Sequence, residues 1–151
     1  MKIIKGDILS VKEGIIVQQV NCQGVMGSGV AKAIRDKYPE VFLHYRAACD
    51  EAANPSELLG QSVVVHIPSD DHLLFVHNIF GQLNYGRDGA VYTNYQALDE
   101  GFKLVRECAE VMDLPVHYPK IGAGLGGGDW EIISEIIERN LDGIDHTLWL
   151  L

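Results

Sequence analysis

Two glycine-rich segments, far apart in a chain of 151 residues, constrain this sequence more than any other feature. The first, NCQGVMGSGVA, runs from Asn21 to Ala31, and the second, PKIGAGLGGGDW, runs from Pro119 to Trp130. Each follows a short apolar run and precedes residues with helical periodicity. Glycine lets the chain reverse and lets a ligand approach the peptide plane, so N–H groups at the mouth of the helix can hold an anion. Two such turns together predict a clamp for a diphosphate.

The hydrophobic pattern switches repeatedly between the period of a strand and that of a helix. Residues 15–20 are nearly continuous in apolar content, as in a buried central strand. Strands joined by long helical crossovers imply a mostly parallel sheet covered on both faces. The full set of expected elements is strands at 3–4, 15–20, 62–67, 73–80, 116–118 and 146–151, and helices at 30–37, 39–53, 93–112 and 130–141.

Both glycine turns begin where an expected strand ends. Ligands of open α/β sheets bind beyond the carboxyl ends of the strands, so the two turns should lie at the same edge and form one cleft.

Size and cysteine content define the setting. A chain of this length with 47% hydrophobic residues can bury a sizeable core, so residues 1–151 are expected to form a single domain. Its three cysteines form neither an even disulfide set nor a CxxC metal pair, and Cys22 is interpreted as a small core residue. No apolar run is long enough for a membrane span or a signal sequence. We therefore expect a cytoplasmic, reduced protein that does not associate with membranes.

The histidines show no metal-ligand spacing, so no metal is expected. Three of them lie in expected strands and three at expected surface positions. The first group is His66, His77 and His117, and the second is His44, His72 and His146.

The charge balance restricts the ligand. A formal net charge of -9 and a pI near 5.0 argue against sequence-independent binding of nucleic acid, which needs clustered lysine and arginine. We expect any bound anion to be held locally, by backbone N–H donors. A site of this kind suits a small nucleotide better than a nucleic-acid strand. Neither turn carries the Gly-Lys-Ser/Thr of a P-loop. The GxGxxG spacing of a dinucleotide fingerprint is also absent. Gly27 and Gly29 match its first two glycines, but the position of its third glycine is Lys32.

Three segments together resemble one family. They are Gly6-Asp7-Ile8, Asn21 with the loop from Gly24 to Ala31, and Ile121-Gly122-Ala123-Gly124-Leu125 followed by Asp129-Trp130. Over almost its whole length the chain resembles the macrodomain family of ADP-ribose-binding modules. It is most similar in appearance to the branch of ADP-ribose 1″-phosphate phosphatases. The resemblance implies an α/β fold, a three-layer α/β/α sandwich with a mixed, mostly parallel six-stranded sheet.

The resemblance also implies roles for individual residues, with no cofactor. Asp7 would accept the adenine amine, Ile8 would donate its backbone N–H, and Asn21 would contact the distal ribose. The remaining ligand contacts would come from the two glycine turns, at Gly27, Ser28, Gly29 and Val30 and at Gly122, Ala123, Gly124, Leu125 and Gly126.

The catalytic group is less determined. Some phosphatases of this branch have a histidine three positions before the asparagine, where this chain has Gln18. The resemblance implies that deconjugating relatives use a lysine near the end of the fourth strand and an acid in the second glycine turn. Here the strand end, residues 78–82, has no lysine, and the turn has three glycines at 126–128 where the acid can stand, so that Asp129 is the only carboxylate nearby. Asp129 or a water held by Asn21 is then the candidate for activating a nucleophile. The alternatives are that Asp129 caps a helix, that Asp7 caps a turn and that Asn21 is a turn residue.

Residues 81–89 form a loop after the fourth expected strand. It is either an ordinary surface loop or one that brings Tyr85 and Arg87 over the cleft, where Arg87 would make a forked contact with a phosphate.

We therefore expect hydrolysis of an ADP-ribose derivative, first of all ADP-ribose 1″-phosphate. The alternatives are a non-catalytic reader of ADP-ribose or of ADP-ribosylated protein, and a hydrolase of ADP-ribosylated protein or nucleic acid. A third class, such as a dehydrogenase, is disfavoured by the missing fingerprint.

Overall fold

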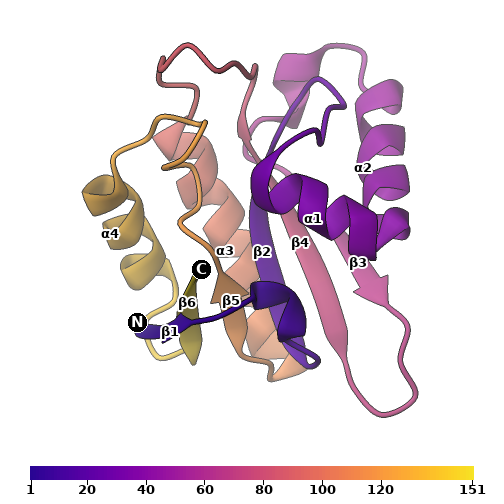
Figure 1. The fold of residues 1–151 in the computed structure, drawn as a ribbon, viewed down its shortest axis with the longest axis vertical. Helices are drawn as coiled ribbons and strands as arrows, with labels where there is room; N and C mark the ends of the chain where they lie inside the picture. The colour runs from indigo at the N-terminus through magenta and orange to yellow at the C-terminus, as the bar shows by residue number, and fades with distance from the viewer.

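A six-stranded sheet forms the centre of the fold, which the computed structural model describes for residues 1–151 (Figure 1). The strand order is β1-β6-β5-β2-β4-β3, and only the β3–β4 pair is antiparallel. The strands are β1 (Lys2–Lys5), β2 (Gly14–Asn21), β3 (Ser62–Ile67), β4 (Leu74–Gln82), β5 (Val116–Tyr118) and β6 (His146–Leu150). The helices are α1 (Gly29–Lys37), α2 (Pro39–Glu51), α3 (Tyr95–Met112) and α4 (Trp130–Asn140). The predicted mixed, mostly parallel six-stranded sheet is confirmed.

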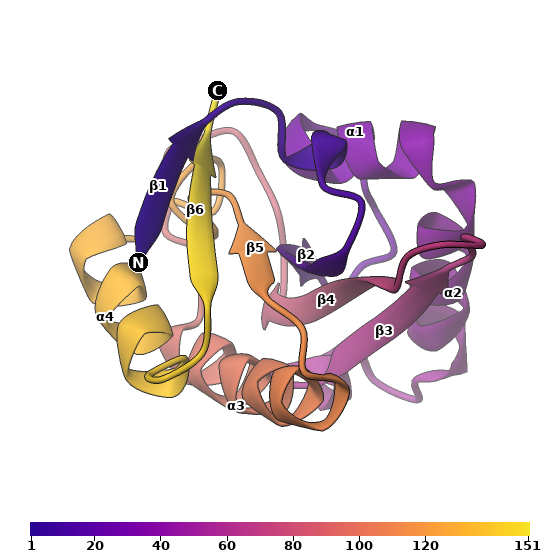
Figure 2. The same cartoon turned by 90° about the horizontal axis from the view of Figure 1, so that it is seen from below.

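The helices cover both faces of the sheet, giving the expected three layers (Figure 2). Alternate side chains of β2 enter two different cores. Ile16 packs in the core that contains Ile34 of α1 and Tyr45 of α2, whereas Val17 packs with Phe102 of α3 and the side chains of α4. β2 is buried along most of its length, as predicted for a central strand.

Local signals set the ends of the helices. Pro39 occupies the first turn of α2, and the Asn94 side chain accepts a hydrogen bond from the Ala97 N–H at the start of α3. Two 3₁₀ helices were not expected, η1 (Ile8–Ser10) and η2 (Pro55–Leu58). β4 also runs two residues beyond its predicted end, to Gln82. This extension brings Gln82 beside the site described below.

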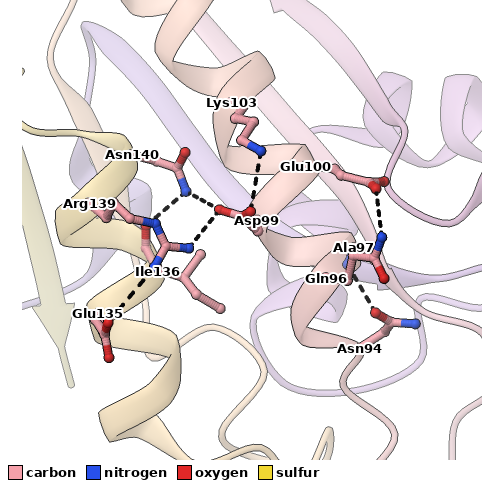
Figure 3. A network of polar contacts seen from close by, with 10 residues as sticks. All are labelled: Asn94, Gln96, Ala97, Asp99, Glu100, Lys103, Glu135, Ile136, Arg139 and Asn140. Carbon is pink, nitrogen blue, oxygen red and sulfur yellow. Dashed lines mark hydrogen bonds and ion pairs between the residues drawn. The ribbon is translucent and has the colours of Figure 1, made fainter.

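A polar network joins the two helices on one face (Figure 3). Asp99 of α3 accepts hydrogen bonds from Asn140 (2.7 Å) and Arg139 (3.0 Å) of α4, and Lys103 lies 3.3 Å from its other carboxylate oxygen. The hydrogen bond from Asn140, more than any other contact, lowers the pKa of Asp99. The network fastens α4, which follows the second glycine turn, to α3.

His146 corrects a sequence prediction. It was expected at the surface, but it is buried on β6, and its Nδ1 lies 2.7 Å from the hydroxyl of Tyr118 on β5. Burial lowers the pKa of His146. The pairing of β5 with β6 is the reason, because it brings the ring of Tyr118 into a stacked position against the His146 ring.

No helix of this fold combines the length and the hydrophobicity that a membrane span requires.

Candidate functional site

Two adjoining cavities open at the carboxyl ends of the central strands. The ribbon in Figure 1 shows the carboxyl ends of β2 and β4 toward the top of the view. The first, of about 430 Å³, lies between the two glycine turns and is called the turn cavity. The second, of about 630 Å³, is lined by Trp130 and Trp149 and is called the tryptophan cavity. Five residues line both cavities, namely Gly29, Val30, Pro119, Lys120 and Gly124. The two cavities therefore adjoin along a shared wall, and together they are called the cleft.

Most residues predicted from the sequence line this cleft. The turn cavity is lined by Asn21, Gly27, Ser28, Gly29, Val30, Tyr85, Arg87, Gly122, Gly124, Leu125 and Gly126. The tryptophan cavity is lined by Asp7, Ile8 and Ala123. Asp129 lines neither. The fold thus brings together segments from both halves of the chain, as the strand-end argument predicted.

The start of α1 presents free backbone donors to the cleft. The first N–H groups of a helix have no partner within it. The side chain of Ser28, at the N-cap, makes no capping hydrogen bond. Gly29 adopts φ +61, and a Cβ placed there would meet nothing within 4 Å. These amides can hold an anion, because they carry the positive end of the helix dipole.

The charge of the turn cavity is opposite to that of the chain. Arg87 and Lys120 are its only charged lining residues, and neither forms an ion pair. No carboxylate and no histidine line it. In a protein of net charge -9, this is a local site for an anion without a side chain suited to acid–base chemistry near neutral pH.

Asn21 holds the first glycine turn in shape. Its Nδ2 donates to the carbonyl of Val25 (2.8 Å), and its Oδ1 accepts from the Gln23 N–H (2.9 Å) and lies 2.9 Å from the Tyr45 hydroxyl. The side chain nevertheless borders the turn cavity, with one amide hydrogen left for a ligand. Asn21 is therefore both a turn residue and a residue of the cleft.

Asp7 likewise is both a capping residue and a residue of the cleft. Its Oδ1 accepts a hydrogen bond from the Leu9 N–H (2.9 Å) and caps η1, and the residue is exposed at the tryptophan cavity. Trp149 is fixed beside it, because its Nε1 donates to Nδ1 of His117 (3.0 Å) and its ring lies against Gly6. A carboxylate at the rim of an apolar, aromatic cavity suits a flat base that carries an amine.

Asp129 is placed as a helix cap. Its Oδ1 accepts from the Glu131 N–H (2.9 Å), and its own N–H donates to the Tyr95 hydroxyl (3.0 Å). The carboxylate is exposed, and the residue borders neither cavity. Its catalytic role stays a prediction without support from this placement.

The loop that carries Tyr85 and Arg87 has internal order. The carboxylate of Asp88 accepts hydrogen bonds from the Tyr92 hydroxyl (2.8 Å) and the Ala90 N–H (3.1 Å), and the first of these lowers the pKa of Asp88. Both Tyr85 and Arg87 border the turn cavity, so this loop is part of its wall.

Cys22 packs beneath the first turn. It is 2% exposed, and burial raises the pKa of its thiol to about 11. Because the thiolate is the nucleophilic form, this cysteine is placed as a core residue, in agreement with its sequence interpretation.

Sequence reasoning missed several lining residues. Lys120 lies within the second glycine-rich segment but was given no role, yet it borders both cavities. Gln19 and Gln82 meet on the floor of the turn cavity, where Gln19 Nε2 donates to Gln82 Oε1 (2.7 Å). Two consecutive glutamines inside an otherwise apolar strand were the available signal.

Comparison with known proteins adds three findings. The family model of the macro domain matches residues 17–137. The DNA ADP-ribosyl glycohydrolase of Mycobacterium tuberculosis is 27% identical over 139 residues, which are 86% of this chain but only 35% of that protein's length. The ADP-ribose 1″-phosphate phosphatase of Debaryomyces hansenii is 27% identical over 166 residues, covering 92% of this chain and 93% of that protein.

The fold itself has solved counterparts. The macrodomain of Mycobacterium tuberculosis DarG matches with a TM-score of 0.83 at 24% identity, covering 99% of this chain and 97% of that structure.

Proposed function

Because this chain belongs to the macro domain family, we propose that it binds ADP-ribose across the two adjoining cavities of the cleft and hydrolyses an ADP-ribose derivative, in the first place ADP-ribose 1″-phosphate. The observation that carries this proposal is the turn cavity, which offers Arg87, Lys120 and free backbone amides and has no lining carboxylate. The names of two relatives, a phosphatase and a glycohydrolase of ADP-ribose compounds, support the general class of reaction.

The two cavities divide the ligand between them. Adenine lies in the tryptophan cavity, where Asp7 accepts its amine and the Ile8 N–H donates to the ring. The diphosphate crosses the shared wall at Gly29 and Gly124, and the distal ribose lies in the turn cavity beside Asn21. Bare backbone at the crossing point is what close approach of phosphate oxygens requires.

A terminal phosphate fits the distal end. It brings about two further negative charges near neutral pH, and Arg87 can bind two of its oxygens in a forked contact. In the reaction a water oxygen bonds to phosphorus while the bond from phosphorus to O1″ breaks. The ribose oxygen ends with a proton that water supplied, and the products are ADP-ribose and inorganic phosphate.

The absence of a lining acid also bears on the choice of linkage. Glycosidic cleavage depends on a positioned acid or base, whereas phosphoryl transfer depends mainly on position and on charge stabilisation. The phosphomonoester is therefore the linkage that this cavity favours.

The same observation favours a second candidate, a non-catalytic reader of ADP-ribose or of ADP-ribosylated protein. The turn cavity can hold an anion but is lined by no carboxylate and no histidine, so it can bind without turnover. Calorimetric titration with ADP-ribose, followed by assay of phosphate release from ADP-ribose 1″-phosphate, separates the two. Binding with release supports the phosphatase. Binding without release supports the reader or a hydrolase of another linkage, and no binding contradicts both.

Two variants assign the roles. Arg87→Leu should lose turnover of the 1″-phosphate and keep most of its ADP-ribose affinity. Asp129→Asn keeps the helix cap, because asparagine is also a favourable N-cap residue, so full activity in this variant would exclude the carboxylate as catalyst.

A further inference from the structure

A chain of hydrogen bonds crosses the floor of the turn cavity. Gln82 Nε2 donates to the carbonyl of Asn84 (2.7 Å), and Gln19 Nε2 donates both to Gln82 Oε1 (2.7 Å) and to Thr93 Oγ1 (3.0 Å). Thr93 Oγ1 in turn donates to the carbonyl of Gly122 (2.8 Å). The chain therefore links the end of β4, the start of α3 and the second glycine turn.

The direction of every bond in this chain is fixed by its ends. The carbonyls of Asn84 and Gly122 can only accept hydrogen bonds. Gln82 therefore directs its NH₂ group to Asn84 and its Oε1 to Gln19, and the Thr93 hydroxyl donates its single hydrogen to Gly122. Gln82 Oε1 and Thr93 Oγ1 can then only accept hydrogen bonds from Gln19. An NH₂ group supplies the two donors required, and no carboxylate or apolar side chain can do so.

The other end of the Gln19 amide explains two glycines. Its Oε1 is buried without a hydrogen-bond donor. A Cβ placed at Gly81 would lie 2.5 Å from that oxygen, and a Cβ placed at Gly122 would lie 3.0 Å from it. The backbones of β4 and of the second turn thus close on the amide from two sides, and any larger residue at either place would displace it.

Backbone bonds fasten the same two segments. The carbonyl of Gly126 accepts from the N–H groups of Tyr92 (2.8 Å) and Thr93 (3.0 Å). Residues 82–93, which carry Tyr85 and Arg87, are therefore tied to the second turn at one end and to Gln19 at the other. We propose that Gln19 is a positioning residue, which sets residues 82–93 and the second glycine turn in one arrangement. The inference rests on the proposed function, because this arrangement forms the wall that holds the diphosphate and the distal ribose.

Hydrogen exchange of the ligand-free protein tests the tie without any assumption about the ligand. Gln19→Leu keeps the approximate size of the side chain and removes both donors. The amides of Tyr92, Thr93 and Gly128, all bonded within the tied segments, should exchange about tenfold faster, as expected for easier local opening. Gln61→Leu is the matched control, since Gln61 is exposed and its side chain donates only to the carbonyl of Glu57.

Binding tests the consequence for function. In Gln19→Leu the affinity for ADP-ribose should fall about tenfold, whereas the affinity for adenosine, which needs only the tryptophan cavity, should change less than about twofold. Thr93→Val breaks the same chain one bond further on. If the two residues act through one chain, the double variant should bind ADP-ribose about as well as the weaker single variant. Independent local effects would instead multiply to about a hundredfold loss.

Three results would overturn the proposal. They are unchanged exchange at those amides, ADP-ribose affinity within twofold of the parent, or equal losses for ADP-ribose and adenosine. Should Gln19→Leu fail to fold, Thr93→Val alone must give the same pattern, and its absence overturns the proposal equally. If the parent protein binds no ADP-ribose, the proposed function is refuted, while the exchange rates still decide whether Gln19 fastens the turn.

Discussion

The hydroxyl of Tyr45 on α2 lies 2.7 Å from the carbonyl oxygen and 2.9 Å from the side-chain oxygen of Asn21 at the end of β2. The same hydroxyl accepts the N–H of Gly24 at 3.1 Å. Burial raises the pKa of Tyr45 far above its usual value, so the phenol stays a hydrogen-bond donor. The first glycine turn is thus held in place by α2, a helix that contributes no residue to the lining of the cleft.

Tyr45→Phe should therefore loosen the first turn. The variant removes the hydroxyl from the Asn21 oxygens and leaves the buried Gly24 N–H without its acceptor, although Asn21 Oδ1 keeps the hydrogen bond from the Gln23 N–H. This loss should lower the free energy of unfolding by about 1–3 kcal/mol. Urea denaturation measures the change, and ADP-ribose affinity should fall with it. Tyr38→Phe, at the junction of α1 and α2, serves as the control and should change stability by less than about 0.5 kcal/mol. Equal stability of the two variants would contradict this role of Tyr45.

Gly124→Val separates binding from folding. A Cβ at Gly124 meets nothing within 4 Å, and this glycine borders both cavities. The variant should keep its melting temperature and lose ADP-ribose binding, because the branched side chain enters the space for the diphosphate.

Gly127→Val is the contrasting variant and should lower the melting temperature. Gly127 has φ +69, and its Cβ would lie 2.4 Å from the carbonyl oxygen of Ala90, so the fold itself should be destabilised. Thermal unfolding and calorimetry on both variants check the contrast, and normal binding by Gly124→Val would remove this turn from the site.

Asp7 needs two substitutions, because its carboxylate both caps η1 and borders the tryptophan cavity. Asp7→Ala should cost about 1 kcal/mol of stability through loss of the cap and should also weaken adenosine binding. Asp7→Asn keeps a capping oxygen and replaces the charged acceptor, so stability should hold while adenosine affinity falls. If Asp7→Asn binds adenosine as the parent does, the carboxylate contributes only the cap.

The burial of His77 should make the free energy of unfolding depend on pH. Burial lowers its pKa to about 4, below the value of about 6.5 for an unfolded chain. Protonation therefore favours the unfolded state: the stability is fully present above about pH 6.5 and is lost as the pH falls toward 4, with about 2 kcal/mol lost by pH 5. Urea unfolding between pH 7 and pH 5 should show this slope. It should be shallower in His77→Gln and unchanged in His44→Gln, which alters an exposed histidine. A slope that survives in His77→Gln would assign it to other groups, such as His117 and His146, whose pKa values burial also lowers.

The elements of this fold were predictable because their apolar periods are strong. The run from Ile15 to Val20 is nearly continuous in apolar content, as in a buried central strand, and all its residues except the half-buried Gln19 are buried. Strand order was not predictable in the same way, because it depends on pairs that the chain does not place near each other. Ile3 pairs with Leu148 across the length of the sequence, and the error over His146 came from not knowing that β5 would cover it.

The candidate site likewise has features that the sequence could predict and features that depend on contacts between distant residues. Glycine turns at strand ends could be assigned to a cleft because carboxyl ends of parallel strands share an edge. The Gln19–Gln82 bond could not be assigned, since it joins side chains 63 positions apart and depends on where β4 ends. Asp129 borders neither cavity, and its carboxylate caps α4, which the sequence had left as an even alternative to a catalytic role.

The pairing of β1 with β6 affects when, during folding, the tryptophan cavity is completed. Asp7 and Ile8 line the tryptophan cavity together with Trp149 and Leu150, and the Gly6 N–H donates to the Leu150 carbonyl at 2.7 Å. Contacts between segments so distant in sequence carry a large loop-closure entropy and tend to form late. A nascent chain that still lacks residues 146–150 has no partner for β1 and no closed pocket for a base. Ligand binding would then be one of the last properties that the chain acquires, and its appearance during refolding would time the closure of the sheet at that edge.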